Sequence, residues 1–67
     1  MAVLKVIEIM ASSEKSWEDA TREAVKMAAK TVKEIRSVYV QDMSAVVNRA
    51  NVTEFRVNVK ITFEILN

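Results

Sequence analysis

Residues 55–65, FRVNVKITFEI, alternate apolar and polar side chains without interruption. Successive side chains of a β-strand point to opposite faces, so this alternation is typical of a strand with one face on a core and the other in water. Together with Glu54 the stretch predicts a strand over residues 54–65. At about 3.3 Å per residue this strand is roughly 40 Å long, which is long for so small a domain.

Two further strands are predicted upstream. Residues 2–10, AVLKVIEIM, are rich in β-branched side chains and apolar on both alternating faces, as expected of a strand covered on each side. Residues 37–47, SVYVQDMSAVV, predict a less regular strand, because Asp42 and Ser44 interrupt its apolar side. The turn into the last strand is predicted at residues 48–51, where two asparagines tolerate a positive φ in a chain without glycine.

An amphipathic helix is predicted between the first two strands, over residues 14–34. Apolar side chains recur there at steps of three and four, at Trp17, Ala20, Ala24, Met27, Ala28, Thr31 and Ile35. Ser16 is the expected N-cap, with Asp19 completing an approximate capping box. The alanines allow close approach to a sheet, and Trp17 is expected in the core or at a subunit interface. Three methionines are expected to fill the core, namely Met10, Met27 and Met43.

These elements predict a single α+β domain over residues 1–67 in the order β-α-β-β. The last two strands form an antiparallel hairpin, and the helix lies across one face of the sheet. A chain near 60 residues buries only about 60% of the surface that it exposes when unfolded, so its core is thin. One helix of about 30 Å also leaves part of the sheet and its edges uncovered. Both arguments predict a homo-oligomer in which neighbouring subunits cover these surfaces.

The composition excludes most classes of enzyme. The 67 residues include no cysteine, histidine or glycine. This rules out thiolate nucleophiles, zinc–thiolate sites, imidazole acid–base chemistry and glycine-rich phosphate loops. Neither a nucleophile–base pair nor a pair of catalytic carboxylates is evident in the sequence. We therefore do not expect an enzyme.

Charge and hydropathy argue against two kinds of partner. Ten basic and nine acidic residues leave the chain near neutral, which does not favour nucleic acid or a membrane surface. No apolar run approaches the roughly 18 residues of a transmembrane helix. Residues 1–10 carry Lys5 and Glu8 within their apolar stretch and do not resemble a secretory signal. A soluble, cytoplasmic protein is expected.

From Val3 to Leu66 the chain resembles the dodecin family. The resemblance rests on the β-α-β-β order in under 70 residues, the opening V-x-K-V-I-E-I, the serine-rich turn before the helix, and the closing F-R-V-N-V-K-I-T-F-E-I. It implies a three-stranded antiparallel sheet wrapped around one helix, assembled as a hollow homododecamer. It also implies flavin (riboflavin, FMN or FAD) bound between subunits, for storage or sequestration rather than catalysis.

The same resemblance supplies candidate cofactor-binding residues. In flavin-binding members a tryptophan early in the second strand stacks on the isoalloxazine ring, and Ser37 stands at that position. A glutamine of the third strand reaches the pyrimidine edge of the flavin, and Arg56 stands there; it could pair with a phosphate or stack on a planar ring. Tyr39, two residues after Ser37 on the same side of the strand, could supply another ring, with Gln41 next in that row.

Loss of the stacking tryptophan leaves an alternative function open. The chain would then be a dodecin-like shell that has lost the flavin site and acts as a structural or cation-binding assembly. Side-chain oxygens near the helix start could coordinate calcium or magnesium; they belong to Ser12, Ser13, Glu14, Ser16, Glu18 and Asp19. Capping of the helix accounts for these residues more simply, so no metal ligand is assigned. The serine at position 37 favours the alternative function, whereas the flavin binding of many family members favours flavin storage.

Overall fold

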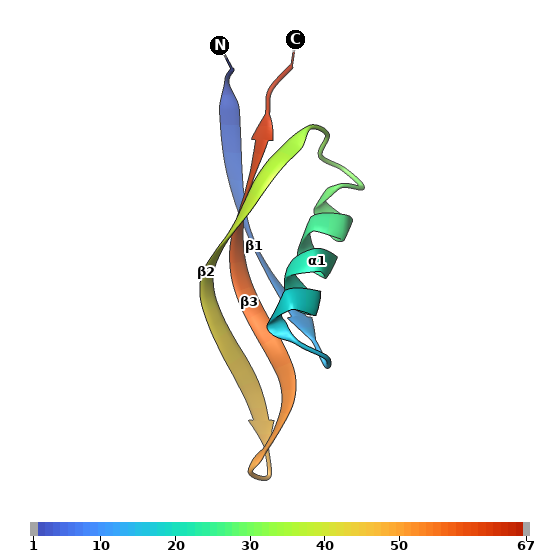
Figure 1. Cartoon of the computed structure of the whole chain (residues 1–67), viewed down its shortest axis with the longest axis vertical. Coiled ribbons are helices and arrows are strands. Elements are labelled where there is room, and N and C mark those ends of the chain that lie inside the picture. Colours follow the sequence, from blue (N-terminus) through green and yellow to red (C-terminus); the bar gives the residue numbers. More distant parts are fainter. Residues whose placement is uncertain (1, 67) are drawn as a thin grey trace.

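Three strands and one helix follow one another in the predicted β-α-β-β order (Figure 1). The computed structural model describes residues 2–66. The elements are β1 (Leu4–Ser13), α1 (Trp17–Ala28), β2 (Ile35–Asn48) and β3 (Asn51–Glu64). In the described part of the chain, α1 is too short and too polar to cross a membrane.

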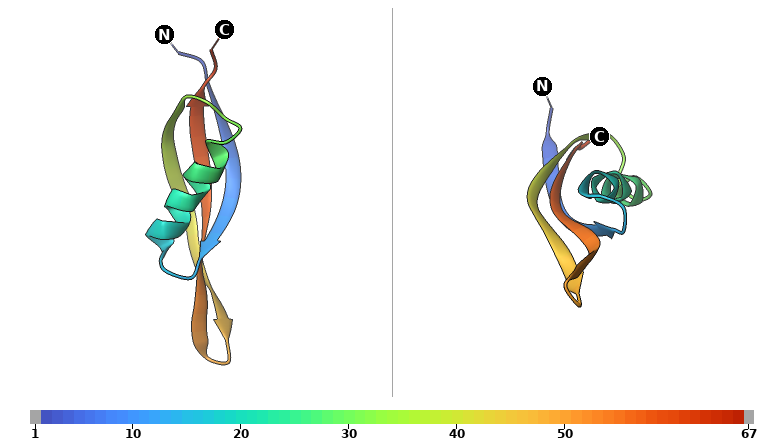
Figure 2. Two further views of the ribbon diagram at one scale, coloured as in Figure 1. Left: turned by 90° about the vertical axis from the view of Figure 1, so that its right-hand side faces the viewer. Right: turned by 60° about the horizontal axis from the view of Figure 1, so that its bottom comes forward.

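The strands form one antiparallel sheet in the order β1-β3-β2. The last strand of the sequence is therefore the central strand, paired along both edges, which explains why it carries the most regular alternation. The sheet is curved, and α1 lies on its concave side (Figure 2). This confirms the predicted sheet wrapped around one helix.

The core lies where the helix crosses the sheet. Val57, Val59 and Ile61 of β3 are fully buried. They pack against three buried alanines of α1, at Ala20, Ala24 and Ala28. Small side chains on the helix let it lie close to the sheet, as the sequence predicted. The methionine prediction was wrong, because Met10, Met27 and Met43 are 60%, 59% and 63% exposed.

Much of the sheet extends beyond the helix. The molecule measures 51 × 19 × 13 Å, and the β2–β3 hairpin continues past the start of α1 (Figure 1). Several large apolar side chains are consequently open to solvent on all three strands. A surface of this kind is typical of a chain that is covered by other molecules.

The helix is shorter at both ends than the predicted range of 14–34. It begins at Trp17, because β1 continues to Ser13 and the Oγ atom of Ser16 accepts a hydrogen bond of 2.9 Å from the backbone N–H of Asp19. It ends at Ala28, after which the chain turns back toward the sheet. Glu34, with a φ of 61°, lies in the left-handed region immediately before β2.

Two irregularities in β2 explain its uneven sequence. The register with β3 shifts between Ile35 and Ser37 and again between Val40 and Asp42. Each shift leaves one extra residue on β2, as in a β-bulge, at Arg36 and at Gln41. The second shift pairs Asp42 with Asn58. Asn58 lies between the buried Val57 and Val59 in the sequence and so points away from the helix. A polar residue that the sequence placed on the apolar side therefore lies on the other face.

The hairpin turn lies where it was predicted but uses other residues. Arg49 and Ala50 have positive φ values of 52° and 67°, whereas Asn48 and Asn51 form the last cross-strand pair. Two consecutive left-handed residues are the signature of a type I′ turn, whose twist matches that of the strands. The prediction that asparagines supply the left-handed conformation was therefore wrong, because the turn is centred between them.

Replacing Ala50 with glycine should stabilise this turn. A left-handed conformation costs a residue with a Cβ atom roughly 1 kcal/mol, so the free energy of unfolding should rise by about that amount. Ala45→Gly is the matched control, because Ala45 lies within β2 and there glycine should lower stability by about 0.5–1 kcal/mol. Urea denaturation followed by circular dichroism measures both. Equal loss of stability in both variants would contradict the turn geometry.

Candidate functional site

The face of the sheet turned away from α1, here called the outer face, carries the candidate ligand-binding residues. Val57, Val59 and Ile61 face the helix, so the residues that alternate with them on β3 point outward. Directly paired residues of neighbouring strands share a face. The β2 residues on the outer face therefore include Ser37, Tyr39 and Ser44, which pair with Thr62, Lys60 and Arg56 of β3.

The structure brings together two of the four predicted cofactor-binding residues. Ser37 and Tyr39 are neighbours on the outer face, and Tyr39 is 65% exposed. Arg56 shares this face, but it lies about 20 Å along β3 from the partner of Ser37. A planar ligand on Ser37 and Tyr39 would therefore not reach Arg56 of the same chain.

Gln41 does not continue the row of Ser37 and Tyr39, as the sequence had predicted. It is the extra residue at the second register shift and has no direct partner on β3. Asp42 takes the next place on the outer face, opposite Asn58. An acidic residue thus stands where an amide was expected, because a bulge interrupts the alternation of the strand.

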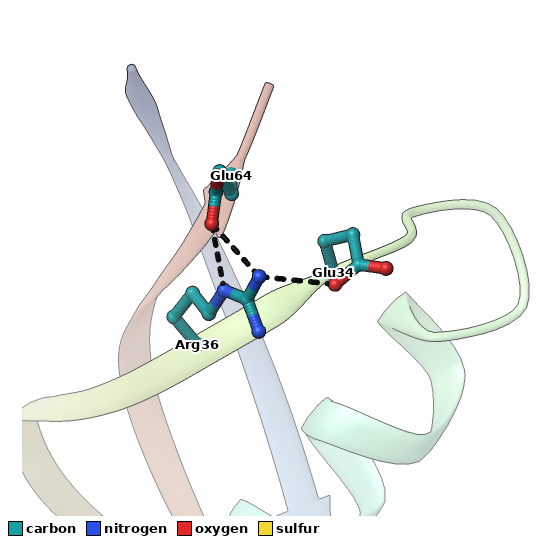
Figure 3. Close-up of polar contacts among 3 residues, drawn as sticks. All are labelled: Glu34, Arg36 and Glu64. Carbon is teal, nitrogen blue, oxygen red and sulfur yellow. Dashed lines mark hydrogen bonds and ion pairs between the residues drawn. The ribbon is translucent and has the colours of Figure 1, made fainter. Parts of the chain in front are cut away.

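Next to Ser37, the guanidinium of Arg36 lies between two carboxylates (Figure 3). Its Nε and Nη2 atoms donate to Oε1 of Glu64 at 3.0 and 2.8 Å, and Nη2 lies 3.2 Å from Oε2 of Glu34. The hydrogen bond and the negative charge of Glu64 raise the pKa of Arg36. The backbone N–H of Glu64 also donates to the carbonyl of Glu34 at 3.0 Å. These contacts tie the start of β2 to the end of β3.

Sequence reasoning missed this ion cluster, although the sequence held a signal for it. Once the hairpin turn is placed at residues 48–51, counting back along both strands brings Arg36 opposite the end of the last strand. The basic side chain then meets Glu64, which is far away in the sequence. The sequence did not show the two extra residues of β2, at Arg36 and Gln41, which set the exact position of Arg36 relative to β3.

A pocket of about 460 Å³ opens beside the ion cluster. It lies between the α1–β2 connection and the C-terminal end of the sheet, and its lining comprises Thr31, Val32, Lys33, Glu34, Phe63, Glu64, Ile65 and Leu66. Glu34 and Glu64 belong both to this lining and to the cluster. Arg36 therefore neutralises part of the acidic wall of the pocket.

The oxygen-rich segment before the helix serves as a cap. The hydroxyl of Ser13 donates to Oδ2 of Asp19 at 2.6 Å and accepts from the backbone N–H of Lys15 at 2.9 Å. Together with the cap at Ser16, these bonds engage three of the six side chains that had been considered as cation ligands, namely Ser13, Ser16 and Asp19. Within residues 2–66, no group of three or more acidic, histidine or cysteine side chains converges on one point. The acidic side chains of the described residues therefore do not gather around a single cation within one chain.

Trp17 joins the helix to the hairpin within one chain. Its ring packs edge-on against Phe55, with centroids 4.9 Å apart at 73°. Its Nε1–H donates to the backbone carbonyl of Ser44 at 2.8 Å. The side chain covers part of the hairpin but stays 38% exposed, so it lies at the edge of the core rather than within it.

Similarity to known proteins agrees with this architecture. The family model "Dodecin" matches residues 3–66. The calcium dodecin of Mycobacterium tuberculosis is 36% identical over 64 residues, which cover 96% of this chain and 90% of that protein. The crystal structure of that calcium dodecin is described with a novel calcium-binding site. This chain matches it with a TM-score of 0.84 and 34% identity, over 97% of this chain and 93% of the other.

A second solved structure is closer in shape and more distant in sequence. A variant of the dodecin from T. thermophilus matches with a TM-score of 0.93 and 25% identity over the whole of both chains. The family match spans all four elements of the fold, and the β-α-β-β order along the chain and the antiparallel hairpin of the last two strands are as the sequence predicted. The chain therefore belongs to the dodecin family, whose members are small binding proteins without enzymatic activity.

Proposed function

We propose that this chain forms a dodecin shell, a homododecamer, that binds and stores calcium rather than a flavin. The observation that carries the proposal is the occupant of the flavin-stacking position. Ser37 is exposed there, and its partner on the outer face is Thr62, so two hydroxyl groups stand where a flavin-binding member presents an aromatic ring. The similarity to a calcium dodecin along nearly the whole chain supports the choice of ion.

The missing ring weakens flavin binding by a large factor. Stacking of a planar base on an aromatic side chain contributes about 1–3 kcal/mol, and a similar value for flavin corresponds to roughly 5- to 150-fold in affinity. Serine supplies none of this contact. Calcium, by contrast, is bound by carboxylate, carbonyl and water oxygens and needs no aromatic surface.

Flavin remains the second candidate because of Tyr39. Its ring is the most exposed aromatic side chain described, on the same face as Ser37 and directly opposite Lys60. A flavin stacked on Tyr39 would have a positive charge nearby to pair with a phosphate. Removing this ring with Tyr39→Ala should abolish any flavin binding if the second candidate is correct.

Restoring the aromatic ring tests the choice between the two ligands. Wild-type protein should bind calcium in a calorimetric titration and leave the fluorescence of riboflavin, FMN and FAD unquenched at micromolar concentration. Ser37→Trp should raise flavin affinity by about 5- to 150-fold. Ser44→Trp is the control, because it adds the same ring to the outer face at a distant position. Strong flavin quenching by the wild type without calcium binding would refute the proposal.

A further inference from the structure

We infer that the connection between α1 and β2, residues 29–34, is a strap that opens and closes over the neighbouring pocket, with Arg36 as its latch. Residues 31–34 of this strap form one wall of the pocket, and the end of β3 with the two residues after it forms the other. A strap that swings away from the sheet uncovers the apolar side chains beneath it. This movement is separate from the choice between calcium and flavin proposed above.

The strap is attached at its two ends. At the helix end, the backbone N–H groups of Thr31 and Val32 donate to the carbonyl of Ala28 at 3.1 and 2.8 Å. At the sheet end, the carbonyl of Glu34 accepts from the backbone N–H of Glu64 at 3.0 Å. The helix end continues the last turn of α1, so it can stay in place as a pivot while the sheet end is released.

The sheet end of the closed strap carries a strained residue. Glu34 has a φ of 61°, in the left-handed region, although it has a Cβ atom. This conformation is unfavourable for such a residue and persists in a fold only where the surrounding contacts enforce it. Once those contacts are lost, Glu34 returns to a negative φ, which turns the strap away from β2. Strain at Glu34 therefore favours the open strap.

Arg36 supplies the contact that opposes this strain. Its Nη2 atom lies 3.2 Å from Oε2 of Glu34, while its Nε and Nη2 atoms donate to Oε1 of Glu64 (Figure 3). Glu64 is the last residue of the central strand, so Arg36 is anchored to the sheet on one side and holds the strap on the other. Arg36 takes this direction because it is the extra residue of a bulge, which re-aims a side chain.

The contacts that close the strap are weak enough to be released. The side chains of Arg36 and Glu34 are 51% and 40% exposed, so water and salt screen their attraction. Of the six strap residues, Val32 is half-buried and the other five are exposed. A segment with few buried apolar contacts opens at low cost in free energy. The closed strap therefore depends on the latch.

Opening of the strap changes access to the pocket. Phe63 alternates with the buried Ile61, so it faces the helix side of the sheet, and it lines the pocket together with Ile65. Concave sites with apolar walls and a few charged groups are the usual form of small-molecule sites. The strap thus controls the entry of molecules that are too large for the closed pocket.

Hydrogen exchange of the full chain in its assembled form, read by mass spectrometry with fragmentation to single residues, tests the latch. The amide of Glu64 is the reporter, because its bond to Glu34 breaks when the strap opens. In Arg36→Gln this amide should exchange about 1.5- to 5-fold faster than in the wild type, the factor that corresponds to loss of an exposed ion pair. Sodium chloride at about 1 M should remove most of this difference, because it screens the ion pair of the wild type.

Two controls separate opening of the strap from fraying of the sheet. The amide of Ile65 donates to the carbonyl of Val3 at 2.8 Å, at the same end of the sheet, and should keep its wild-type exchange rate in Arg36→Gln. Arg22→Gln removes the same charge from an exposed position of α1 and should leave exchange at Glu64 unchanged. Equal acceleration at Glu64 and Ile65 would mean that the end of β3 frays, which would overturn the strap. An unchanged rate at Glu64 in Arg36→Gln would show that Arg36 is not the latch.

Discussion

Ile61→Ala is expected to lower the free energy of unfolding by about 2–5 kcal/mol, the usual cost of removing a large side chain from a core. Ile61 is fully buried on the central strand β3, where it pairs with Ile7 on one side and Val38 on the other. The helix that covers it presents alanines, which cannot extend to fill a cavity. Because the single core of a domain with fewer than about 70–80 residues supplies only about 3–5 kcal/mol, this loss removes most of the stability, and much of the chain population should unfold.

Val52→Ala provides the control for this prediction. Val52 lies near the hairpin turn and is 54% exposed, so the same kind of truncation should change stability by less than about 0.5 kcal/mol. Chemical denaturation at one fixed protein concentration gives both values, since association also contributes to stability. A similar loss in the two variants would mean that the core lies elsewhere than under α1.

Trp17→Ala should have the second-largest effect, about 2–3 kcal/mol. Full truncation of a buried tryptophan costs about 3–5 kcal/mol, and Trp17 is partly exposed, which reduces the loss. The variant loses both the edge-on contact with Phe55 and the hydrogen bond to Ser44. Thermal unfolding followed by far-ultraviolet circular dichroism measures the effect without relying on the fluorescence of the residue removed.

Trp17→Phe separates the two contributions. It keeps an aromatic ring against Phe55 but cannot donate to the carbonyl of Ser44, so a loss of about 1 kcal/mol is expected. If the phenylalanine variant were as unstable as the alanine variant, the hydrogen bond rather than the ring contact would hold the hairpin to the helix.

The central strand was the most predictable element because both of its neighbours impose the same pattern. Residues of β3 either face the helix or face away, and their sequence alternates accordingly. The helix was found from its spacing, but its ends were not. They depend on where β1 stops and on where the chain turns away after Ala28, and neither leaves a periodic signal. The turn was located correctly because two apolar strands flank it, while its left-handed residues were misassigned.

The candidate site was less predictable than the fold. Ser37 and Tyr39 share a face because they are two residues apart in a regular part of β2, and local alternation is enough to predict that. The departure of Gln41 from this row depends on a bulge, which inserts a residue without altering the composition of the strand. The distance of Arg56 from Ser37 depends on the pairing of two long strands, which a resemblance in short motifs does not specify.

The extra residue at Gln41 reverses the facing of the β2 residues that follow it, compared with regular alternation from Val40. Met43 and Ala45 therefore face the helix, and Asp42 and Ser44 lie on the outer face. Regular pairing through Gln41, without the bulge, would turn Asp42 and Ser44 toward the apolar face that packs on the helix. The bulge therefore restricts β2 to the register in which these two polar side chains stay in water.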